Sequence, residues 1–588
     1  MSAVTSAFSK LNPFSSKSKR THEDDEEDDG EEIDQTTLAG GGHAGRQTDI
    51  TKNQLRVPHA LKSFLVSQGV LSEEAAALDK EEELTDALHE LLDRPHIKVP
   101  LELTDRSHPL PNYFISSSHN TYLLAHQLYG SSSATAYERA LKAGARCVEI
   151  DAWDGDDPEE PKVTHGYTLT SNIPFRAVCE AIRDVVDQEA REAVDAQGYR
   201  AAPIMLSLEN HCDAHGQQRL AAIMREVFGD RLLTKAIRDK GTREQEGTGE
   251  HVTLGELQSK ITVMVEYHFP NEPDSDSDSA SSDSEDEDEK KARHDYKDKK
   301  KAAATTVIVP ELAELGIYAQ SVKPPNNAWF ESGVLENSPH HPLINVSESG
   351  LSAHMPAHNA PIAQHNANHL MRVYPKGTRI SSRNLKPVPY WGVGAQVCAM
   401  NWQTFGASMQ LNEALFSGTD GYVLKPAPLR TGGSGKLDSY KRVKLRLHVA
   451  GASDIPCPED RKEDIKPYLT CTLVHPDDLE QKPPKRKTSP YKQHTFTFMH
   501  KGDNPPVTDP VWDEILEWEY QDNELVFLRM LIKSDDSFAR NPIYAVGTVR
   551  LLYVQNGWVF VRMLDLKGRE TKCGLCVKFE FTEVDGRT

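Results

Sequence analysis

The sequence lacks a long hydrophobic run. No stretch is apolar over the roughly 20 residues that a helix needs to cross a bilayer, and no apolar signal-peptide core appears near Met1. Hydrophobic residues make up only 38% of the 588 residues, which predicts that part of the chain is disordered. This length also predicts about two or three domains. We therefore expect a cytoplasmic protein of several domains.

The chain also lacks the regular cysteine spacing of a disulfide framework. Its eight cysteines are scattered, which fits a reducing compartment. Cys573 and Cys576 form the single closely spaced pair, "CGLC", and no second pair completes a zinc site. A metal or redox role and an ordinary place in a strand both remain open, and the β-strand pattern of this segment favours the strand.

A concentrated basic face is missing as well, so nucleic acid is not an expected partner. Acidic residues are abundant instead. The net charge is −22, and two runs without Lys or Arg, residues 23–34 and 274–289, carry nineteen of these negative charges. The rest of the chain is therefore close to neutral. We predict a disordered tail over residues 1–45 and an acidic disordered linker over residues 269–305.

Short apolar strands alternate with helical segments from residue 110 onward, which predicts a parallel α/β architecture. The acidic linker interrupts this alternation near its middle, so the barrel that we expect is split into two sequence halves. A closed barrel has eight strands, and the sequence offers nine candidates, so one of them is not a strand or lies outside the barrel. The candidates are "YFISSSHN", "CVEIDAWD", "VTHGY", "IMLSLENH", "ITVMVEY", "IYAQSV", "INVSES", "MRVYP" and "VCAMNW".

Two further segments flank the predicted barrel. Residues 51–93 have the apolar spacing of helices but no Asp-x-Asp-x-Asp-Gly loop for calcium. After the Gly- and Ser-rich residues 430–439, about seven alternating segments predict an antiparallel β-sandwich: "VKLRLHVAGASDI", "PYLTCTLV", "KQHTFTF", "DEILEWEY", "LVFLRMLIK", "AVGTVRLL" and "CVKFEF". The expected fold class is thus a split α/β barrel of the TIM type, preceded by short helices and followed by a β-sandwich.

Polar side chains recur where the predicted barrel strands end. In a (β/α)₈ barrel, catalytic residues gather at the carboxyl ends of the strands. Three carboxylates with an amide oxygen form a hard oxygen set of the kind that Ca²⁺ or Mg²⁺ prefers. A divalent cation beside two histidines and an arginine suits displacement at phosphorus. The strand-end residues are His119, Asn120, Glu149, Asp151, His165 and Glu209 before the linker, and Ser347, Arg372 and Tyr374 after it.

The motifs at these strand ends resemble a known family. "SSSHNTYL", "VEIDAWDG", "HGYTLTS" and "LSLENH" resemble the X half of the eukaryotic phosphoinositide-specific phospholipases C. "MRVYPKGTRISSRN", "CAMNWQT" and "GYVLKPAPLR" resemble their Y half. The terminal sandwich is similar to a C2 domain and the first helices to a reduced EF-hand segment, in a delta-like layout without a pleckstrin-type domain.

This resemblance implies six segments. They are a disordered tail (1–45), degenerate EF-hand-like helices (46–103), the X half of the catalytic barrel (104–268), the acidic linker (269–305), the Y half (306–431) and a C2 β-sandwich (440–583).

The resemblance also implies a function. It is the calcium-dependent hydrolysis of phosphatidylinositol 4,5-bisphosphate, phosphatidylinositol or both to diacylglycerol and inositol phosphate, through a cyclic inositol phosphate. The implied partners are phosphoinositide lipids in an anionic membrane surface, where the protein is peripheral; no protein activator is identified. A catalytically silent phosphoinositide-binding scaffold is the alternative, although the chain keeps both histidines and all the carboxylates of the set.

Roles are carried over residue by residue from the matching motifs. Glu149 is the expected base for the inositol 2-hydroxyl, His119 stabilises charge on the phosphorus, and His165 protonates the leaving oxygen. The expected Ca²⁺ ligands are Asn120, Glu149, Asp151 and Glu209. The expected ring-binding residues are Ser347, Arg372 and Tyr374, and the expected membrane rim is Leu128, Tyr167 and Leu169.

Two departures from the family's pattern fall on the strand "KITVMVEYH". In the family this strand ordinarily supplies lysines to the ring phosphates, and here those places fall on Met264 and Glu266. A carboxylate repels a phosphate, and Met donates no hydrogen bond. We therefore expect weakened selectivity for the bisphosphorylated headgroup, with Lys260 or a loop lysine as the alternative source of positive charge.

Two histidine pairs have the i, i+4 spacing that can chelate a metal on a helix, His354 with His358 and His365 with His369. Pro356 interrupts the first pair, and the second lies in a segment that reads as the helix before a barrel strand. Ordinary helix residues are the favoured interpretation.

Overall fold

The computed structural model of the chain describes residues 54–584, apart from 81–83, 124–132, 165–171, 193–197, 199–200, 239–250, 269–306, 325, 332, 336–338, 377–383, 438–440, 459–464, 480–481, 495–502 and 536–541. The predicted tail over residues 1–45 and the predicted acidic linker over residues 269–305 lie outside the described residues.

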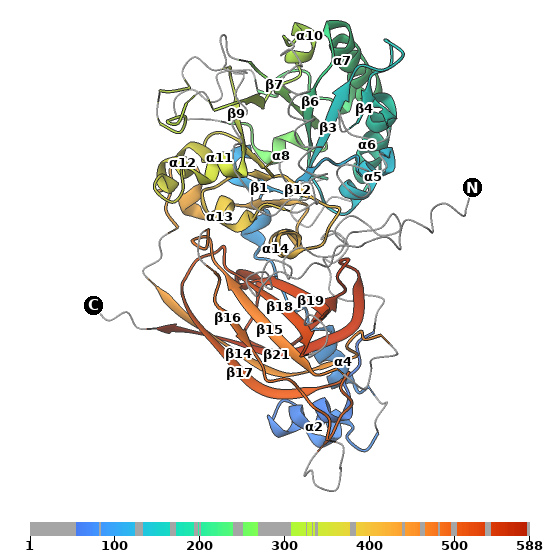
Figure 1. Cartoon of the computed structure of the whole chain (residues 1–588), viewed down its shortest axis with the longest axis vertical. Coiled ribbons are helices and arrows are strands. Elements are labelled where there is room, and N and C mark those ends of the chain that lie inside the picture. Colours follow the sequence, from blue (N-terminus) through green and yellow to red (C-terminus); the bar gives the residue numbers. More distant parts are fainter. Residues whose placement is uncertain are drawn as a thin grey trace, which may run out of the picture.

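A closed barrel of parallel strands forms the upper half of the molecule in Figure 1. Each strand pairs in parallel with the next, β1 pairs with β11, and a parallel bridge from Ser117 to Cys147 joins the end of β1 to β3. Within the described residues the staves are β1 (Tyr113–Ile115), β3 (Cys147–Trp153), β6 (Ile204–Asn210), β7 (Ile261–Glu266), β8 (Gln320–Val322), β9 (Pro342–Ser347), β10 (Met371–Tyr374) and β11 (Val397–Cys398). The predicted split α/β barrel is confirmed.

The ninth candidate strand, "VTHGY", lies outside the barrel. Its first residue ends β4 (Lys162–Val163), which pairs antiparallel with β3 and with β5 (Ile173–Pro174). β13 (Tyr422–Leu424) pairs antiparallel with β1, and β2 (Ser118–His119) pairs with β12 (Met400–Asn401). β4 and β5 extend the barrel sheet beyond β3, and β13 extends it beyond β1, whereas β2 and β12 form a separate two-stranded sheet.

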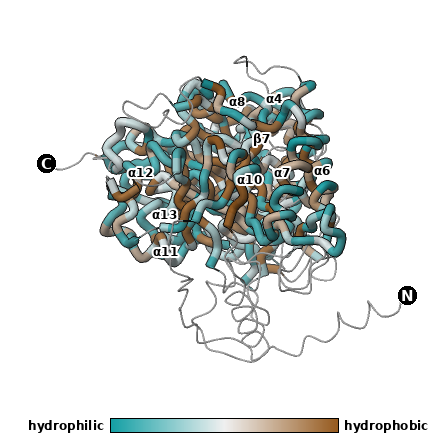
Figure 2. Tube along the Cα trace, turned by 90° about the horizontal axis from the view of Figure 1, so that it is seen from above, coloured by the Kyte–Doolittle hydropathy of each residue, from teal (hydrophilic) through white to brown (hydrophobic). Residues whose placement is uncertain are grey.

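α6 (Phe175–Glu189) shows how an apolar stripe lets a helix cover the barrel. It buries Phe175, Val178, Ile182 and Val185, which share one helical face. Hydrophobic segments lie toward the middle of the barrel and hydrophilic ones around it (Figure 2). The other helices of this part are α5 (Ala134–Lys142), α7 (Ala214–Phe228), α8 (Leu254–Leu257), α10 (Pro310–Ala313), α11 (Glu348–Ser352), α12 (Asn359–Asn366), α13 (Pro387–Gly392) and α14 (Ala407–Phe416).

An antiparallel β-sandwich follows the barrel, as predicted. Its strand order is β16-β15-β18-β19-β20-β21-β14-β17. The strands are β14 (Arg442–Ser453), β15 (Pro467–Val474), β16 (Lys485–Lys487), β17 (Val511–Gln521), β18 (Phe527–Ser534), β19 (Ile543–Arg550), β20 (Gly557–Leu564) and β21 (Glu570–Val584). Cys573 and Cys576 are buried strand residues with free thiols, so they form no disulfide.

Two of these strands were not expected from the sequence pattern. β16 is short and all of its residues are exposed, while β20 is buried over most of its length. Neither strand shows the alternation of buried and exposed residues that marks a half-buried strand. The segment expected to be a strand, "KQHTFTF" (492–498), is not one over residues 492–494, and its remainder lies outside the described residues.

The N-terminal helices pack against the sandwich rather than the barrel (Figure 1). These helices are α2 (His59–Ser67), α3 (Glu73–Ala76) and α4 (Asp86–Asp93). Leu61 and Phe64 of α2 join a hydrophobic cluster with Trp558 and Phe560 of β20. Arg56 pairs with Asp454 and Asp509 beside this cluster at 2.9 and 2.7 Å.

Barrel and sandwich meet along α14. Arg529 Nε donates a buried hydrogen bond to Gln410 Oε1 at 2.7 Å, and the Tyr553 hydroxyl donates to the Leu415 carbonyl oxygen at 2.8 Å. Phe527 of the sandwich packs near Trp391 of the barrel, with ring centroids 5.9 Å apart. A buried interface of apolar contacts and paired polar groups holds the two parts in a fixed orientation.

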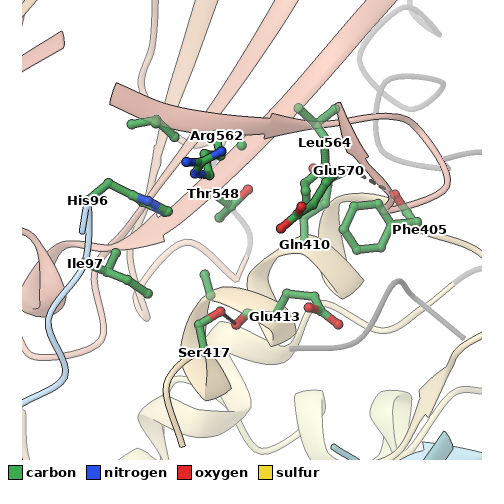
Figure 3. Close-up of a pocket in the computed structure, with 14 residues that line it drawn as sticks. His96, Ile97, Phe405, Gln410, Glu413, Ser417, Thr548, Arg562, Leu564 and Glu570 are labelled. Atoms are coloured by element: carbon green, nitrogen blue, oxygen red, sulfur yellow. Dashed lines mark hydrogen bonds between the residues drawn. The ribbon is translucent and has the colours of Figure 1, made fainter. Parts of the chain in front are cut away.

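A pocket opens at this interface (Figure 3). α14 contributes Gln410 and Glu413, the sandwich contributes Thr548 and Arg562, and His96 comes from the segment before the barrel. None of the described polar strand-end residues lines it. The pocket is therefore separate from the barrel mouth. Among the described residues, no helix is both long and apolar enough to span a bilayer.

The paired histidines do not gather around a metal site. The rings of His365 and His369 stack with centroids 4.7 Å apart, and His354 and His358 lie against Phe330. Across the part of the chain that the structure describes, no group of three or more potential metal ligands includes a histidine.

Buried histidines make the stability of the barrel depend on pH. His341, 5% exposed beside β9, has its pKa lowered to about 3 by burial and then by His340 and His251. Burial lowers the pKa of His369 to about 3 as well. In an unfolded chain a histidine titrates near ~6.5. The unfolded state therefore takes up protons first, so stability that is complete above pH ~6.5 is lost as the pH falls toward the folded pKa values.

We expect His341→Asn to weaken this pH dependence. Asn tolerates the left-handed φ of 52° that His341 adopts, so the backbone at this position is preserved. Between pH 6.5 and 5 the wild type should lose about 2 kcal/mol of unfolding free energy at this site, and the variant should not. Urea unfolding of the full chain at both pH values measures the difference. His494→Gln, at an exposed histidine, is the control; a loss in H341N as large as in the wild type contradicts the prediction.

Candidate active site

The polar strand-end residues that the structure describes lie on the inner face of the barrel at one end. In a parallel sheet, residues paired in register point to the same side. Asp151 is in register with Glu209, and Glu149 with Ser207 and so with Met264. On the opposite wall Asn345 is in register with Arg372, and Ser347 with Tyr374. The strands thus bring distant parts of the sequence to one barrel mouth.

Three carboxylates converge at this mouth. One oxygen from each of Glu149, Asp151 and Glu209 lies within 4.8 Å of the others. Glu149 is 1% and Asp151 6% exposed. Burial, and then the charges of Glu209 and Glu149, raise the pKa of Asp151 well above its usual range. Burial and Glu149 raise the pKa of Glu209 in the same way. Crowding these negative charges in a buried place costs free energy that a cation would offset.

The donor set fits a hard divalent cation. Carboxylate oxygens are the ligands that Ca²⁺ and Mg²⁺ prefer, and within the described part of the chain no histidine or cysteine belongs to the group. Asp151 Oδ1 is buried and has no hydrogen-bond partner among the residues that the structure describes. A buried carboxylate oxygen without a donor is expected where a cation binds, because such an atom is otherwise costly.

Asn120 follows the end of β2 in a turn that brings it into the same group. Its φ is 47°, a left-handed conformation that Asn tolerates. In this turn its backbone N–H donates to Glu149 Oε2 at 2.6 Å. The buried hydroxyl of Tyr122 lies 3.0 Å from Asn120 Oδ1 and 2.7 Å from Asp151 Oδ2. Tyr122 therefore fixes two of the predicted cation ligands relative to each other.

The serines of "SSSHN" connect the end of β1 to the barrel mouth. The Ser116 carbonyl oxygen accepts hydrogen bonds from the backbone of β3, and the Ser117 carbonyl oxygen accepts from Met400 and from the Trp402 indole. Ser116, Ser117 and Ser118 are all buried. These contacts hold the segment after β1 between β3 and β12, so that His119 and Asn120 follow it at the mouth.

Arg372 supplies the positive charge that faces the carboxylates. It is 2% exposed; its Nη2 donates to Glu149 Oε1 at 2.5 Å, and its Nη1 lies 3.7 Å from Glu209 Oε1. Nη1 also donates to Asn345 Oδ1 at 3.2 Å. Burial opposes the charge of Arg372, but Glu149 and then Glu209 outweigh burial, and its pKa is raised. The guanidinium predicted to bind a ring phosphate is thus paired with the carboxylates here.

His119 is held at the edge of the same group. Its Nδ1 lies 2.8 Å from Asn401 Oδ1, and its Nε2 lies 3.9 Å from Glu149 Oε2. Because the amide oxygen is an acceptor, Nδ1 carries the ring proton and Nε2 faces the carboxylates. Burial, and then the charge of Arg372, lower the pKa of His119 to about 4.

Of the remaining predicted site residues, two lie in the described part of the chain and four do not. Ser347 is buried and caps α11, where its Oγ accepts from the Gly350 N–H at 3.2 Å. Tyr374 lies beside Arg372, with its ring centroid 5.5 Å from the guanidinium carbon. The other four lie outside the described residues: His165, Leu128, Tyr167 and Leu169.

The β7 residues that depart from the family's pattern also belong to the barrel wall. Met264 is 2% exposed and shares its register layer with Glu149, and Glu266 pairs in register with Ser321. Lys260 lies just before β7, and its ammonium donates to the Asp230 carbonyl oxygen at 2.6 Å. Since Lys260 precedes the strand, it lies at the end of the barrel away from the carboxylates and does not replace the missing lysines.

Three residues of the site were not assigned from the sequence. Tyr122 and Asn401 lie within the motifs "SSSHNTYL" and "CAMNWQT", but nothing in their spacing shows that one reaches Asp151 and the other His119. Asn345 precedes Ser347 by two positions in β9, so the period of a strand places both on the inner face. That period was the available signal for Asn345.

Three family models match separate parts of the chain. Residues 106–267 match the family model described as phosphatidylinositol-specific phospholipase C, X domain. Residues 312–428 match the model of the Y domain of the same family, and residues 443–559 match the C2 domain.

Curated relatives carry consistent descriptions. The chain is 31% identical to "1-phosphatidylinositol 4,5-bisphosphate phosphodiesterase delta-3" of Mus musculus, over 79% of this chain and 55% of that protein. It is 32% identical to "1-phosphatidylinositol 4,5-bisphosphate phosphodiesterase" of Dictyostelium discoideum, over 83% and 61%. A relative from Candida albicans is 30% identical over 81% and 48%. The chain spans about half to three fifths of the length of these relatives.

Solved structures share the fold. The crystal structure of L. pealei PLC21 aligns with a TM-score of 0.67 and 22% identity, over 93% of this chain and 69% of that chain. S. officinalis PLC21 aligns with a TM-score of 0.66 and 23% identity, over 92% and 65%. At these identities the likeness establishes the architecture of barrel and sandwich.

We predict that the carboxylate group binds one divalent cation. Asp151→Asn should weaken calcium binding by roughly tenfold or more, because it removes a charge from the buried ligand set. Isothermal titration calorimetry of the full chain at pH 7 measures the affinity. Asp184→Asn is the matched control, since Asp184 is 69% exposed and pairs with Arg183 on the surface. Equal calcium affinity in D151N and the wild type would show that the ion binds elsewhere.

Proposed function

The chain belongs to the phosphatidylinositol-specific phospholipase C family, and from this premise we propose that it catalyses the calcium-dependent hydrolysis of phosphoinositides. The products are diacylglycerol and an inositol phosphate, formed through a cyclic inositol phosphate. The observation that carries the proposal is the convergence of Glu149, Asp151 and Glu209 at one barrel mouth, beside Arg372 and His119.

The cation of this site is Ca²⁺, held by the side chains of Asn120, Glu149, Asp151 and Glu209. The supporting observations are the hard oxygen donors and the unpartnered Asp151 Oδ1. When bound, the ion supplies positive charge that acidifies the inositol 2-hydroxyl and stabilises charge on the phosphoryl oxygens.

The chain's own residues move the protons of the first step. Glu149 takes the proton of the 2-hydroxyl as that oxygen attacks the phosphorus. The bond between phosphorus and the glycerol oxygen breaks, and His165 gives a proton to that oxygen, so diacylglycerol leaves. His119, oriented by Asn401, faces the phosphoryl oxygen with Nε2 and donates to it when this nitrogen carries a proton. Water then opens the cyclic phosphate, with the proton transfers reversed.

The phosphorylated ring binds on the opposite wall of the barrel. Arg372 and Ser347 bind the ring phosphate, and Tyr374 packs on the inositol face; their shared position on β9 and β10 supports this assignment. Leu128, Tyr167 and Leu169 form an apolar rim that enters the lipid surface. The protein is cytoplasmic and peripheral, with the C2 sandwich beside the barrel at an anionic membrane, and the helices of residues 46–103 are a degenerate EF-hand segment.

We expect His119→Ala and His165→Ala each to lower kcat by about a hundredfold or more, because a positioned acid or base contributes that much to proton transfer. Turnover of phosphatidylinositol and its mono- and bisphosphates in mixed vesicles measures this, with and without a calcium chelator. His215→Ala, at an exposed helix position, is the control. If the wild type binds these lipids but turns none over, with or without calcium, the silent scaffold is the correct function.

Two residues of β7 predict how strongly the protein prefers the bisphosphate. Met264 offers no donor, and the carboxylate of Glu266 repels a ring phosphate, so the wild type should show only a small preference for the bisphosphate. Glu266→Lys should raise the ratio of kcat/KM for the bisphosphate over that for phosphatidylinositol by roughly tenfold. Glu311→Lys adds the same charge at an exposed position and should leave the ratio unchanged. An unchanged ratio in E266K would rule out this role for Glu266.

A further inference from the structure

Arg372 lies where the cation site and the phosphate site of the proposed function meet. Its Nη2 donates to Glu149 Oε1 at 2.5 Å, and its Nη1 lies 3.7 Å from Glu209 Oε1. Both carboxylates belong to the group that would hold the cation. The same guanidinium is the expected partner of a ring phosphate. It cannot keep its close pairing with Glu149 and also give the same donors to a phosphate.

The pairing has a clear physical cause. Arg372 and Glu149 are 2% and 1% exposed, so an unpaired charge at either position would be strongly unfavourable. Asp151 and Glu209 add further negative charge within the same 4.8 Å group. Met264, on the wall beside Ser207, brings no positive charge to this layer. Arg372 is therefore the cation that offsets the carboxylates when no metal ion is present.

We propose that Arg372 is an internal counter-ion that competes with the divalent cation for Glu149 and Glu209, and that cation binding releases it to bind the phosphate of the headgroup. The inference rests on the proposed function. A cation drawn to the carboxylates is repelled by the guanidinium already paired with them. A phosphate that accepts hydrogen bonds from Arg372 neutralises this guanidinium and removes the competition.

Cation and headgroup binding are then linked. If a headgroup phosphate tightens cation binding by some factor, the cation must tighten headgroup binding by the same factor. The cation is bound weakly in the absence of lipid and strongly in its presence. The site is thus completed at the membrane surface rather than in solution.

The test measures calcium binding without turnover. Full-length wild type, Arg372→Met and Arg372→Lys are titrated with Ca²⁺ by calorimetry, with and without inositol 1,4,5-trisphosphate as the soluble headgroup. Without headgroup, R372M should bind Ca²⁺ about fivefold or more tightly than the wild type, while R372K, which keeps the charge, should stay near the wild type. The headgroup should tighten Ca²⁺ binding about fivefold or more in the wild type and clearly less in R372M.

Arg146→Met provides the matched control. Arg146 is another buried arginine of the barrel. Its Nη1 lies 2.7 Å from Glu189 Oε2, and Glu189 is not part of the carboxylate group. The loss of Arg146 should leave Ca²⁺ affinity unchanged even if it lowers stability.

An R372M affinity equal to or weaker than that of the wild type overturns the proposal. If R372M does not fold, the wild-type titrations decide, since no effect of the headgroup on Ca²⁺ affinity also overturns it. A wild type that binds no Ca²⁺ refutes the metal site of the proposed function and this inference with it, whereas Ca²⁺ binding with the wrong order of affinities refutes this inference alone.

Discussion

The burial of Glu149 and Asp151, with the half-buried Glu209 placing an oxygen within 4.8 Å of theirs, is the constraint on which the barrel mouth depends. Like charges in a buried place repel, and the structure meets this cost in several ways. Arg372 pairs with Glu149, the Asn120 N–H donates to the same carboxylate, and the Tyr122 hydroxyl lies against Asp151. These contacts do not offset all of the negative charge, above all at Asp151 Oδ1, and a divalent cation would offset the rest.

The arrangement requires a closed barrel, because the contributing residues come from opposite walls. Glu149 and Arg372 are 223 positions apart in the sequence, yet they form a buried hydrogen bond. Parallel strands deliver all their carboxyl ends to one rim, so β3 and β6 bring the carboxylates while β9 and β10 bring Asn345 and Arg372. The linker that separates the two sequence halves is tolerated because it enters between β7 and β8, where the strands still pair.

The sandwich and the N-terminal helices form a second body that is firmly attached to the first. α2 and α4 bury their apolar faces on the sandwich, and Arg529 and Tyr553 bond to α14 of the barrel across a buried interface. Lipid contacts made by the sandwich would therefore orient the barrel mouth as well. Such coupling suits the proposed function, in which the substrate lies in a membrane surface and the proposed counter-ion, Arg372, is released when that substrate binds.

The sequence by itself determined the order of strands and helices, the split barrel and the sandwich, because apolar periodicity and turn residues are local signals. It also indicated which strand ends carry polar residues. It missed β16 and β20, which show no alternation of buried and exposed residues, and it did not identify "VTHGY" as the one of nine candidates that lies outside the barrel. Only the tertiary structure decided that Arg372 pairs with Glu149, that Asn401 orients His119 and that Tyr122 reaches Asp151. These contacts join residues on different strands and turns, and their distances are fixed by barrel closure rather than by any pattern along the chain.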